Sequence, residues 1–492
     1  MFIGIDIGTT ATKAILVDEA QAVLASATYT YKYNSRIAGY AEQHPQIWVD
    51  AAHHCLVDLR KKNAKAYAAT KAISFSGQMH SLVALDGEHK PIKPAMLWND
   101  ARGQSQANEL AQLVPDIESI SGAAAMPSFT ASKLLWMRQN ESDLFGKIKH
   151  ILLPKDFVRL WLTGNLATDH SDAAGTQLYN QQHRKWSDTI TSVVGLNSSA
   201  LPQIYESNDS VGKLRRDVAA ELELPPDCEI IVGGADTADG ALGLGCVAAG
   251  DSFISLGTGS IFATITDGYH PTNQSFLHNF AHCLPNQFYR MGAMLNGASA
   301  LAWAARLVGA EDIGELLKSV EANFKAPSRV MFIPYLNGER TPHNNAELRG
   351  ALLGLDSDSN KLDVAQAVIE GVSFCLRDAM LALGLEATDN GTVGLIGGGA
   401  RSLFWTKILA SILAKPIARY EGADLWPALG AVRLAMLANK NAKLATIATK
   451  PKVESIVVPN ENLLAAYAER YSIYKKAQQV SFDFANFTGR AT

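Results

Sequence analysis

Two glycine- and threonine-rich turns, far apart in the chain, constrain its fold more than any other sequence feature. The first turn, residues 6–10, follows an apolar run, and the second turn, residues 256–260, follows a similar run. Glycine lets the backbone approach an anion, and the N–H groups of a tight turn form a nest for phosphate oxygens. One such turn is also what a β-hairpin needs, whatever its function. The pair predicts a polyphosphate held between two similar parts of the chain.

The groups predicted to bind the polyphosphate are backbone N–H groups and threonine hydroxyls. They are Gly8, Thr9, Thr10, Gly257, Thr258 and Gly259. The carboxylate of Asp6 would repel a bare phosphate, so we expect it to hold Mg²⁺ through a water molecule.

A third glycine cluster, residues 397–400, follows another apolar run and precedes an expected helix. The small residues Gly398 and Gly399 would let an adenine or ribose lie flat on the backbone. Nucleotide chemistry is therefore the leading hypothesis.

Composition limits the classes of protein and partner. A chain of 492 residues is long enough for two large domains. Its formal net charge is −4 and it has no long run of Lys or Arg, which argues against a nucleic-acid partner. The five cysteines lie far apart without a CxxC pair, so we expect reduced, mostly buried thiols and no zinc site.

The sequence does not indicate a membrane partner. The N-terminus enters a strand-like run at once, and we expect no signal peptide. The chain also lacks an uninterrupted apolar run of the roughly 18 residues that a membrane-spanning helix needs. We therefore expect a cytoplasmic protein.

The order of expected elements indicates a repeated architecture. Residues 2–7, 12–17 and 23–31 read as successive antiparallel strands. Strand-like and helical segments then alternate, which is typical of a mixed sheet covered by helices. The opening pattern recurs from residue 252, so we expect an N-terminal domain at residues 1–246 and a C-terminal domain at 247–492.

Several motifs carry a resemblance to a known family. Residues 128–140 (SFTASKLLWMRQN) and 350–370 resemble the two signatures of the FGGY carbohydrate kinases, the sugar-kinase branch of the actin-like ATPase superfamily. Other segments are similar to the family members that phosphorylate D-xylulose. They are residues 77–80, 97–102, 153–156, 171–176 and 338–343. The chain departs from the usual pattern at His44 and at residues 236–239, which read DTAD.

The resemblance implies a fold and an activity. The expected fold is α/β, with two actin-like (ribonuclease H-like) domains, each a mixed β-sheet covered by helices, and an active-site cleft between them. The implied reaction transfers a phosphoryl group from ATP, with Mg²⁺, to D-xylulose and yields D-xylulose 5-phosphate. Its expected partners are the small sugar and ATP, and the sequence leaves open whether the chain forms a homodimer.

Asp236 is the candidate general base, because small residues before it would let a sugar approach and the resemblance implies the same role. The alternative for Asp236 is a helix N-cap. Asp239 reads as an acid in the first turn of that helix.

The expected sugar-binding residues combine polar groups with flat apolar surface. They are Met79, His80, Trp98, Asn99 and Asp100, together with Asp236. Trp98 could equally be a core aromatic residue. Arg340 could contact phosphate or form an ion pair that closes the domains.

Two other functions stay open at this point. The chain could be another FGGY kinase, acting on ribulose, fuculose, gluconate or glycerol. It could also be a nucleotide-switched, actin-like binding protein that phosphorylates no small molecule, although the chain shows no added peptide-binding domain.

Overall fold

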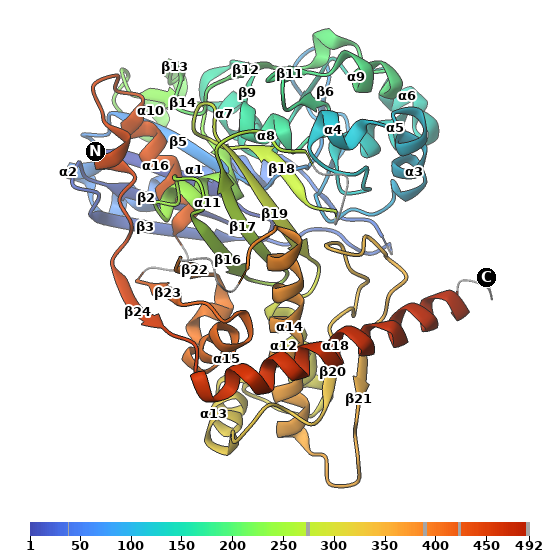
Figure 1. Ribbon diagram of the computed structural model, residues 1–492. Helices are drawn as coiled ribbons and strands as arrows, with labels where there is room; N and C mark the ends of the chain where they lie inside the picture. Colours follow the sequence, from blue (N-terminus) through green and yellow to red (C-terminus); the bar gives the residue numbers. More distant parts are fainter. Residues whose placement is uncertain (38, 272–275, 387–390, 422–424, 489–492) are drawn as a thin grey trace.

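The computed structural model of the chain describes residues 1–37, 39–271, 276–386, 391–421 and 425–488. Its framework is two seven-stranded mixed sheets with helices packed against them (Figure 1). The prediction of two mixed sheets covered by helices is confirmed.

The first sheet contains the predicted N-terminal meander, with the order β13-β14-β5-β1-β2-β3 and β15 added beside β5. Its strands are β1 (Phe2–Ile7), β2 (Ala11–Val17), β3 (Val23–Thr30), β5 (Ala72–Gly77), β13 (Ser210–Lys213), β14 (Glu229–Ile231) and β15 (Gly234–Ala235). Strand β1 runs antiparallel to β2 and parallel to β5.

The two faces of β1 explain how the first sheet is covered. Ile3 and Ile5 are fully buried in a core that includes Trp48 of helix α1 (Gln46–Lys62). On the opposite face, a Cβ atom at Gly4 would lie 2.1 Å from the carbonyl oxygen of Ala428. The absence of a side chain at Gly4 therefore allows helix α16 (Trp426–Leu437) to approach β1 closely.

The second sheet repeats the pairing of the first, in the order β18-β19-β17-β16-β22-β23-β24. Its strands are β16 (Ser252–Leu256), β17 (Ser260–Thr266), β18 (His278–Ala281), β19 (Phe288–Met294), β22 (Val393–Ile396), β23 (Ile417–Tyr420) and β24 (Val453–Val457). Strand β16 is antiparallel to β17 and parallel to β22, as β1 is to β2 and β5. The structure thus contains the repeat that the sequence predicted.

Helices α11 (Asp236–Gly243) and α16 pack closely where the two halves of the chain meet. A Cβ atom at Gly430 would lie 1.9 Å from the carbonyl oxygen of Asp239, so only glycine fits at this crossing. Helix α16 comes from the second half of the chain but packs on β1 and β5 of the first sheet. The two halves therefore share an interface, and the boundary between residues 246 and 247 stays a prediction.

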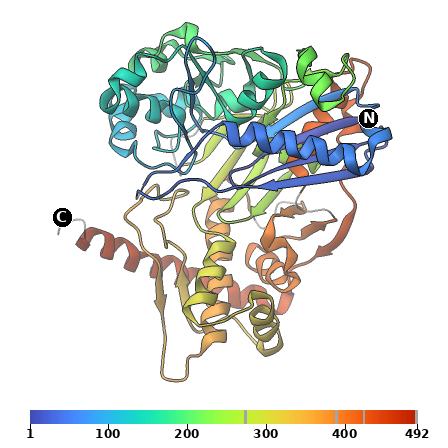
Figure 2. The ribbon, with the colours of Figure 1, turned by 180° about the vertical axis from the view of Figure 1, so that it is seen from behind.

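Other helices complete the two lobes. Those of the second lobe are α12 (Ala298–Leu307), α13 (Ile313–Asn323), α14 (Lys361–Ala382), α15 (Leu403–Leu413) and α18 (Glu461–Thr488). Helix α17 (Leu444–Ile447) follows α16 and packs beside it against the first sheet. Those of the first lobe are α2 (Ala64–Tyr67), α3 (Gln104–Leu113), α4 (Ile117–Ser121), α5 (Thr130–Asn140), α6 (Ser142–Phe145), α7 (Pro154–Thr163), α8 (His170–Ala174), α9 (Asp188–Val194) and α10 (Arg216–Leu222). Helix α18 runs across the second lobe and extends beyond it in both ribbon views (Figures 1 and 2).

Short strand pairs and single-turn helices connect these elements. The pairs are β4 (Glu42–Gln43) with β7 (Ala95–Met96), β6 (Val83–Leu85) with β8 (His150–Leu152), β9 (Ala167–Asp169) with β12 (Gln203–Tyr205), β10 (Tyr179–Asn180) with β11 (Lys185–Trp186), and β20 (Met331–Ile333) with β21 (Ala351–Leu353). The 3₁₀ helices are η1 (Ser198–Ala200) and η2 (Gly398–Arg401).

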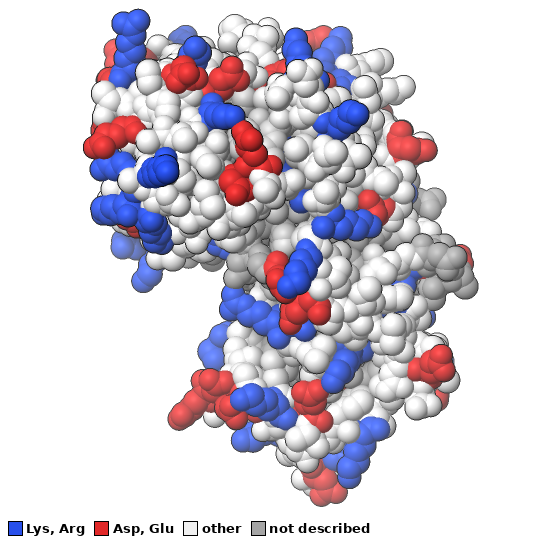
Figure 3. All heavy atoms as spheres, turned by 90° about the vertical axis from the view of Figure 1, so that its left-hand side faces the viewer, with Lys and Arg blue, Asp and Glu red and all other residues white. Residues whose placement is uncertain are grey.

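The cysteines and the charged side chains differ in where they lie. All five cysteines are buried free thiols, as predicted. Within the described residues, no helix combines the length and the apolar character needed to cross a membrane. Charged side chains of both signs are interspersed over the two lobes on the face shown in Figure 3.

Candidate active site

Three parallel strands bring the predicted catalytic groups to one edge of the first sheet. Ser76 of β5 is paired with Asp6 of β1 on one side and with Gly234 of β15 on the other. Asp236 begins helix α11 two residues after Gly234, and His80 follows the end of β5. The carboxyl ends of adjacent parallel strands are a common ligand-binding edge of α/β sheets.

Asp236 is the first residue of α11, and Ala235 occupies the N-cap position. The alternative role of Asp236 as the N-cap is therefore wrong. Its Oδ1 accepts a hydrogen bond from the Thr237 hydroxyl at 3.2 Å. Loss of hydration, and to a smaller extent the charge of Asp6, raise the pKa of Asp236 to about 7.

Asp236 shares a cavity of about 270 Å³ with several of the predicted binding residues. The predicted residues that line it are Met79, His80, Trp98, Asp236, Gly257, Thr258 and Gly259. The remaining lining residues include Thr237, His278 and Arg340. Residues from both halves of the chain thus enclose one space, where Asp236 and the turn at Gly257–Gly259 line the same cavity.

His80 has a fixed tautomer. Its Nδ1 lies 2.6 Å from the carbonyl oxygen of Gly175, which can only accept, so Nδ1 carries the proton and Nε2 is left as an acceptor. Burial is the largest cause that holds the pKa of His80 well below its usual value, with the neighbouring His278 adding to it. A neutral His80 can accept a hydrogen bond from a hydroxyl group of a ligand.

His278 is a cavity residue that sequence reasoning missed. It lies on β18 and is 1% exposed, and neither ring nitrogen has a hydrogen-bond partner among the described residues. Burial lowers its pKa to about 3, so the ring is neutral. The sequence around His278 does not distinguish it from His282, four residues later, which does not line the cavity.

The first phosphate turn is linked to the predicted sugar loop. The Trp98 indole N–H donates a hydrogen bond of 2.9 Å to the Thr9 hydroxyl, and Gln78 donates to the carbonyl oxygen of Gly8 at 3.2 Å. The guanidinium of Arg340 lies 5.5 Å from the centroid of the Trp98 ring. Trp98 therefore lies at the cavity wall with its polar atom engaged, and it is not a core aromatic residue.

Asn99 and Asp100 line a second cavity of about 600 Å³, which also includes Trp98 and Arg340. The Asp100 carboxylate is fully buried and forms hydrogen bonds with Arg102 at 2.6 Å and with the Ala41 N–H at 2.7 Å. The structure thus gives Asp100 a structural ion pair, and its contact with a sugar stays a prediction.

The second phosphate turn is supported by the start of α12. The carbonyl oxygen of Gly257 accepts the N–H of Ala298 at 2.7 Å, and that of Thr258 accepts the Ser299 hydroxyl at 2.6 Å. These bonds fix the carbonyl groups of the turn.

Gly398 and Gly399 line a separate cavity of about 450 Å³, together with residues of α12, α13 and α15. Gly397 has φ +89°, and a Cβ atom there would lie 2.8 Å from the carbonyl oxygen of Leu256. This close approach holds the third glycine cluster beside the end of β16, one residue from the turn that begins at Gly257.

The carboxylates fit a hydrated cation better than a dedicated metal cage. Among the residues that the structure describes, no three His, Cys, Asp or Glu side chains form a ligand set. Asp6 has a pKa raised chiefly by loss of hydration. Mg²⁺ is often held by one or two carboxylates, with waters and phosphate oxygens completing its shell, so these residues fit that ion. The role of Asp6 stays a prediction.

Comparison with known proteins identifies the family. Residues 1–243 match the N-terminal domain, and residues 252–439 the C-terminal domain, of the FGGY family of carbohydrate kinases. A xylulose kinase of Escherichia coli (strain K12) is 36% identical over 480 residues, which are 97% of this chain and 99% of that protein.

Two solved structures are similar in fold over almost their whole length. A "xyloylose kinase" from Brucella ovis is 39% identical, with a TM-score of 0.92 and coverage of 96% of this chain and 98% of that one. A gluconate kinase from Lactobacillus acidophilus is 26% identical, with a TM-score of 0.90 and coverage of 100% and 99%. The fold class is confirmed, and with both family domains matched, this chain belongs to the FGGY family of carbohydrate kinases.

Proposed function

We propose that this chain is a kinase that transfers the γ-phosphoryl group of ATP to the O5 hydroxyl of D-xylulose. The observation that carries the proposal is the cavity in which Asp236 meets Met79, His80 and the Gly257–Gly259 turn. Membership of the FGGY family and the similarity to named xylulose kinases support this substrate over other sugars.

Asp236 is the proposed base. It accepts the proton of the O5 hydroxyl as the bond from O5 to phosphorus forms and the bond from the γ-phosphorus to the bridging oxygen breaks, which releases ADP. In phosphoryl transfer the hydroxyl group loses its proton late in the reaction. A general base works best when its pKa lies near the working pH, so a carboxylate with a pKa of about 7 suits this step near neutral pH.

The proposed sugar contacts are two neutral histidines and an apolar wall. His80 offers Nε2 as an acceptor, and His278 offers one acceptor and one donor nitrogen. Met79 and Trp98 line the same cavity and would contact the carbon chain. Asn99 and Asp100, which line the neighbouring cavity with Trp98 and Arg340, would extend these contacts.

The proposed nucleotide site joins the phosphate turns to the third glycine cluster. Gly8, Thr9 and Thr10 would face the phosphates from one side, and Gly257 to Gly259 from the other. Gly398 and Gly399 would lie beneath the adenosine. Asp6 would hold Mg²⁺ through water, and the ion, when bound, neutralises charge on the phosphate oxygens. Five buried free thiols suit a cytoplasmic enzyme.

A coupled ADP-release assay with Mg·ATP tests the proposal across D-xylulose, ribulose, fuculose, gluconate and glycerol. We expect the largest kcat/KM with D-xylulose and loss of turnover in Asp236→Asn, with nucleotide binding kept. A larger value with gluconate would assign the chain to another branch of the family. If no compound raised turnover above basal hydrolysis, a nucleotide-switched binding protein would replace the kinase as the better proposal.

A further inference from the structure

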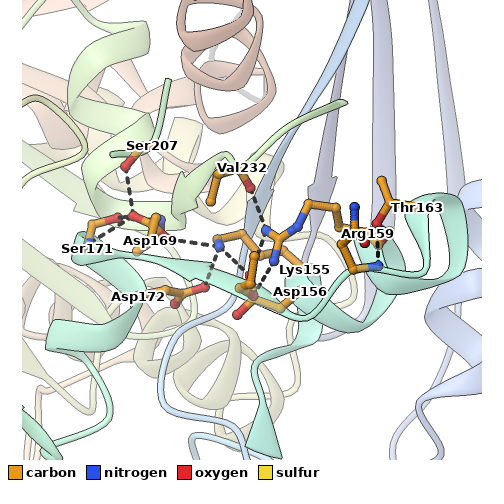
Figure 4. Close-up of polar contacts among 12 residues, drawn as sticks. Lys155, Asp156, Arg159, Thr163, Asp169, Ser171, Asp172, Ser207 and Val232 are labelled. Atoms are coloured by element: carbon orange, nitrogen blue, oxygen red, sulfur yellow. Dashed lines mark hydrogen bonds and ion pairs between the residues drawn. The ribbon is translucent and has the colours of Figure 1, made fainter. Parts of the chain in front are cut away.

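Two motifs with no role in the site so far meet in a buried ionic cluster. Residues 153–156 supply Lys155 and Asp156, and residues 171–176 supply Asp172 (Figure 4). Asp169, two residues before the second motif, also belongs to the cluster. The Lys155 ammonium lies 2.7 Å from Asp156, 2.9 Å from Asp169 and 3.3 Å from Asp172, and all of these side chains are fully buried. Burying so many charged groups is costly, and such a cluster is tolerated where the groups pair closely.

One branch of the cluster leads to the base. Asp169 Oδ1 pairs with Lys155, while Asp169 Oδ2 accepts hydrogen bonds from the hydroxyls of Ser171 and Ser207 (Figure 4). The Ser171 hydroxyl oxygen in turn accepts the N–H of Ala235 at 2.9 Å. Ala235 is the N-cap of α11 and directly precedes Asp236. A continuous polar chain therefore runs from Lys155 to the backbone N–H of Ala235, the residue before the proposed base.

The same short helix also reaches the proposed sugar histidine. Helix α8 (His170–Ala174) contains Ser171 near its start and is followed by Gly175. The Gly175 carbonyl accepts the Nδ1 proton of His80. A Cβ atom at Gly175 would lie 2.9 Å from that Nδ1, so the helix end and the imidazole are in close contact.

We propose that Ser171 is a positioning residue that holds Asp236 in register with His80 through α8, which Lys155 and Asp169 anchor. This inference rests on the proposed function of Asp236. Ser171 touches neither substrate nor nucleotide in this scheme, and its hydroxyl is the only side-chain group in the relay that contacts the backbone of the base loop. Side chains that fix a reacting group within a fraction of an ångström are needed for full rate.

The structure provides a matched control. Ser207 is also buried and donates its hydroxyl to the same Asp169 Oδ2, at 2.8 Å, but its hydroxyl has no hydrogen bond to Ala235. Ser171→Ala and Ser207→Ala each remove one buried hydroxyl from one carboxylate oxygen. Only the first leaves the Ala235 N–H without its acceptor.

The test compares both variants with the full-length wild type in the coupled assay with D-xylulose, and measures Tm and sugar binding by calorimetry. We expect Ser171→Ala to lower kcat by about 10- to 100-fold, because a small misplacement of a reacting group has effects of this size. Its sugar Kd should stay close to that of the wild type. The two variants should lower Tm by similar amounts, because each loses one buried hydroxyl group. Ser207→Ala should keep kcat within about 3-fold of the wild-type value.

Three outcomes would overturn the inference: equal losses of kcat in the two variants, wild-type kcat in Ser171→Ala, or a rise in sugar Kd that accounts for the whole loss of kcat/KM. Failure of the proposed function would look different. In that case the wild type itself would not use D-xylulose, and the two serine variants would be compared with the sugar that the panel identifies.

Discussion

Asp6 and the strand that leads to Asp236 flank β5 at one edge of the first sheet. Asp6 pairs with Ser76 from β1, and Gly234, two residues before Asp236, pairs with Ser76 from β15. The negative charge of Asp6 contributes to the raised pKa of Asp236. The two carboxylates therefore act on each other before any ligand binds, and this coupling yields the first two predictions.

The rate of sugar phosphorylation should depend on the ionisation of Asp236. A carboxylate with a pKa of about 7 is protonated below that pH and cannot accept a proton, so kcat/KM for the sugar should fall about tenfold for each pH unit below 7. Asn at position 6 removes the neighbouring charge. We expect Asp6→Asn to shift the acidic limb of the pH profile to lower pH, and an unchanged limb would contradict the coupling.

The charge of Asp236 should also cost stability. Its pKa is higher in the folded chain than the ordinary value of 3.8, so the folded state loses stability as pH rises from about 4 to about 7. Asp236→Asn removes this cost and should raise the free energy of unfolding by about 1–3 kcal/mol at pH 8. At pH 4 the gain should be small. Denaturant unfolding at both pH values measures the difference, and an equal gain at both would rule out a charge effect.

His278 should contribute to sugar affinity and not to nucleotide affinity. Replacing His278 by Phe keeps a flat ring in the aromatic cluster with Phe129 and Phe280 but removes both ring nitrogens. The loss of one or two hydrogen bonds should raise the sugar KM by about 3- to 10-fold, with the KM for ATP unchanged. His282→Phe is the control, because that histidine is also buried but lies outside the cavity.

Gly398 and Gly399 should respond differently to a methyl group. A Cβ atom at Gly398 has open space, whereas one at Gly399 would lie 2.4 Å from the Leu256 side chain. Gly399→Ala should therefore lower Tm. Gly398→Val should leave Tm unchanged and raise the KM for ATP by about tenfold, if the adenosine lies against it. An unchanged KM in Gly398→Val would place the nucleotide elsewhere.

Local sequence patterns predicted much of the fold because they report local physics. The first meander was predicted at residues 2–31 and occupies β1 to β3. Its echo was predicted from residue 252 and appears in β16 and β17. A strand and the turn that follows it can be predicted from a short stretch of sequence, because alternating apolar residues and turn glycines lie next to each other in the chain.

The sequence by itself determined the two glycine turns and the repeated strand pattern and predicted Asp236 as the base, because each of these depends on residues close together in the chain. Only the tertiary structure decided that Ala235 caps α11, that Asp100 is engaged by Arg102, and that His278 faces the same cavity as His80. It also joined Ser171 to Ala235, 64 positions later. Such contacts depend on strand order and register across two sheets, and no local pattern of side chains encodes them.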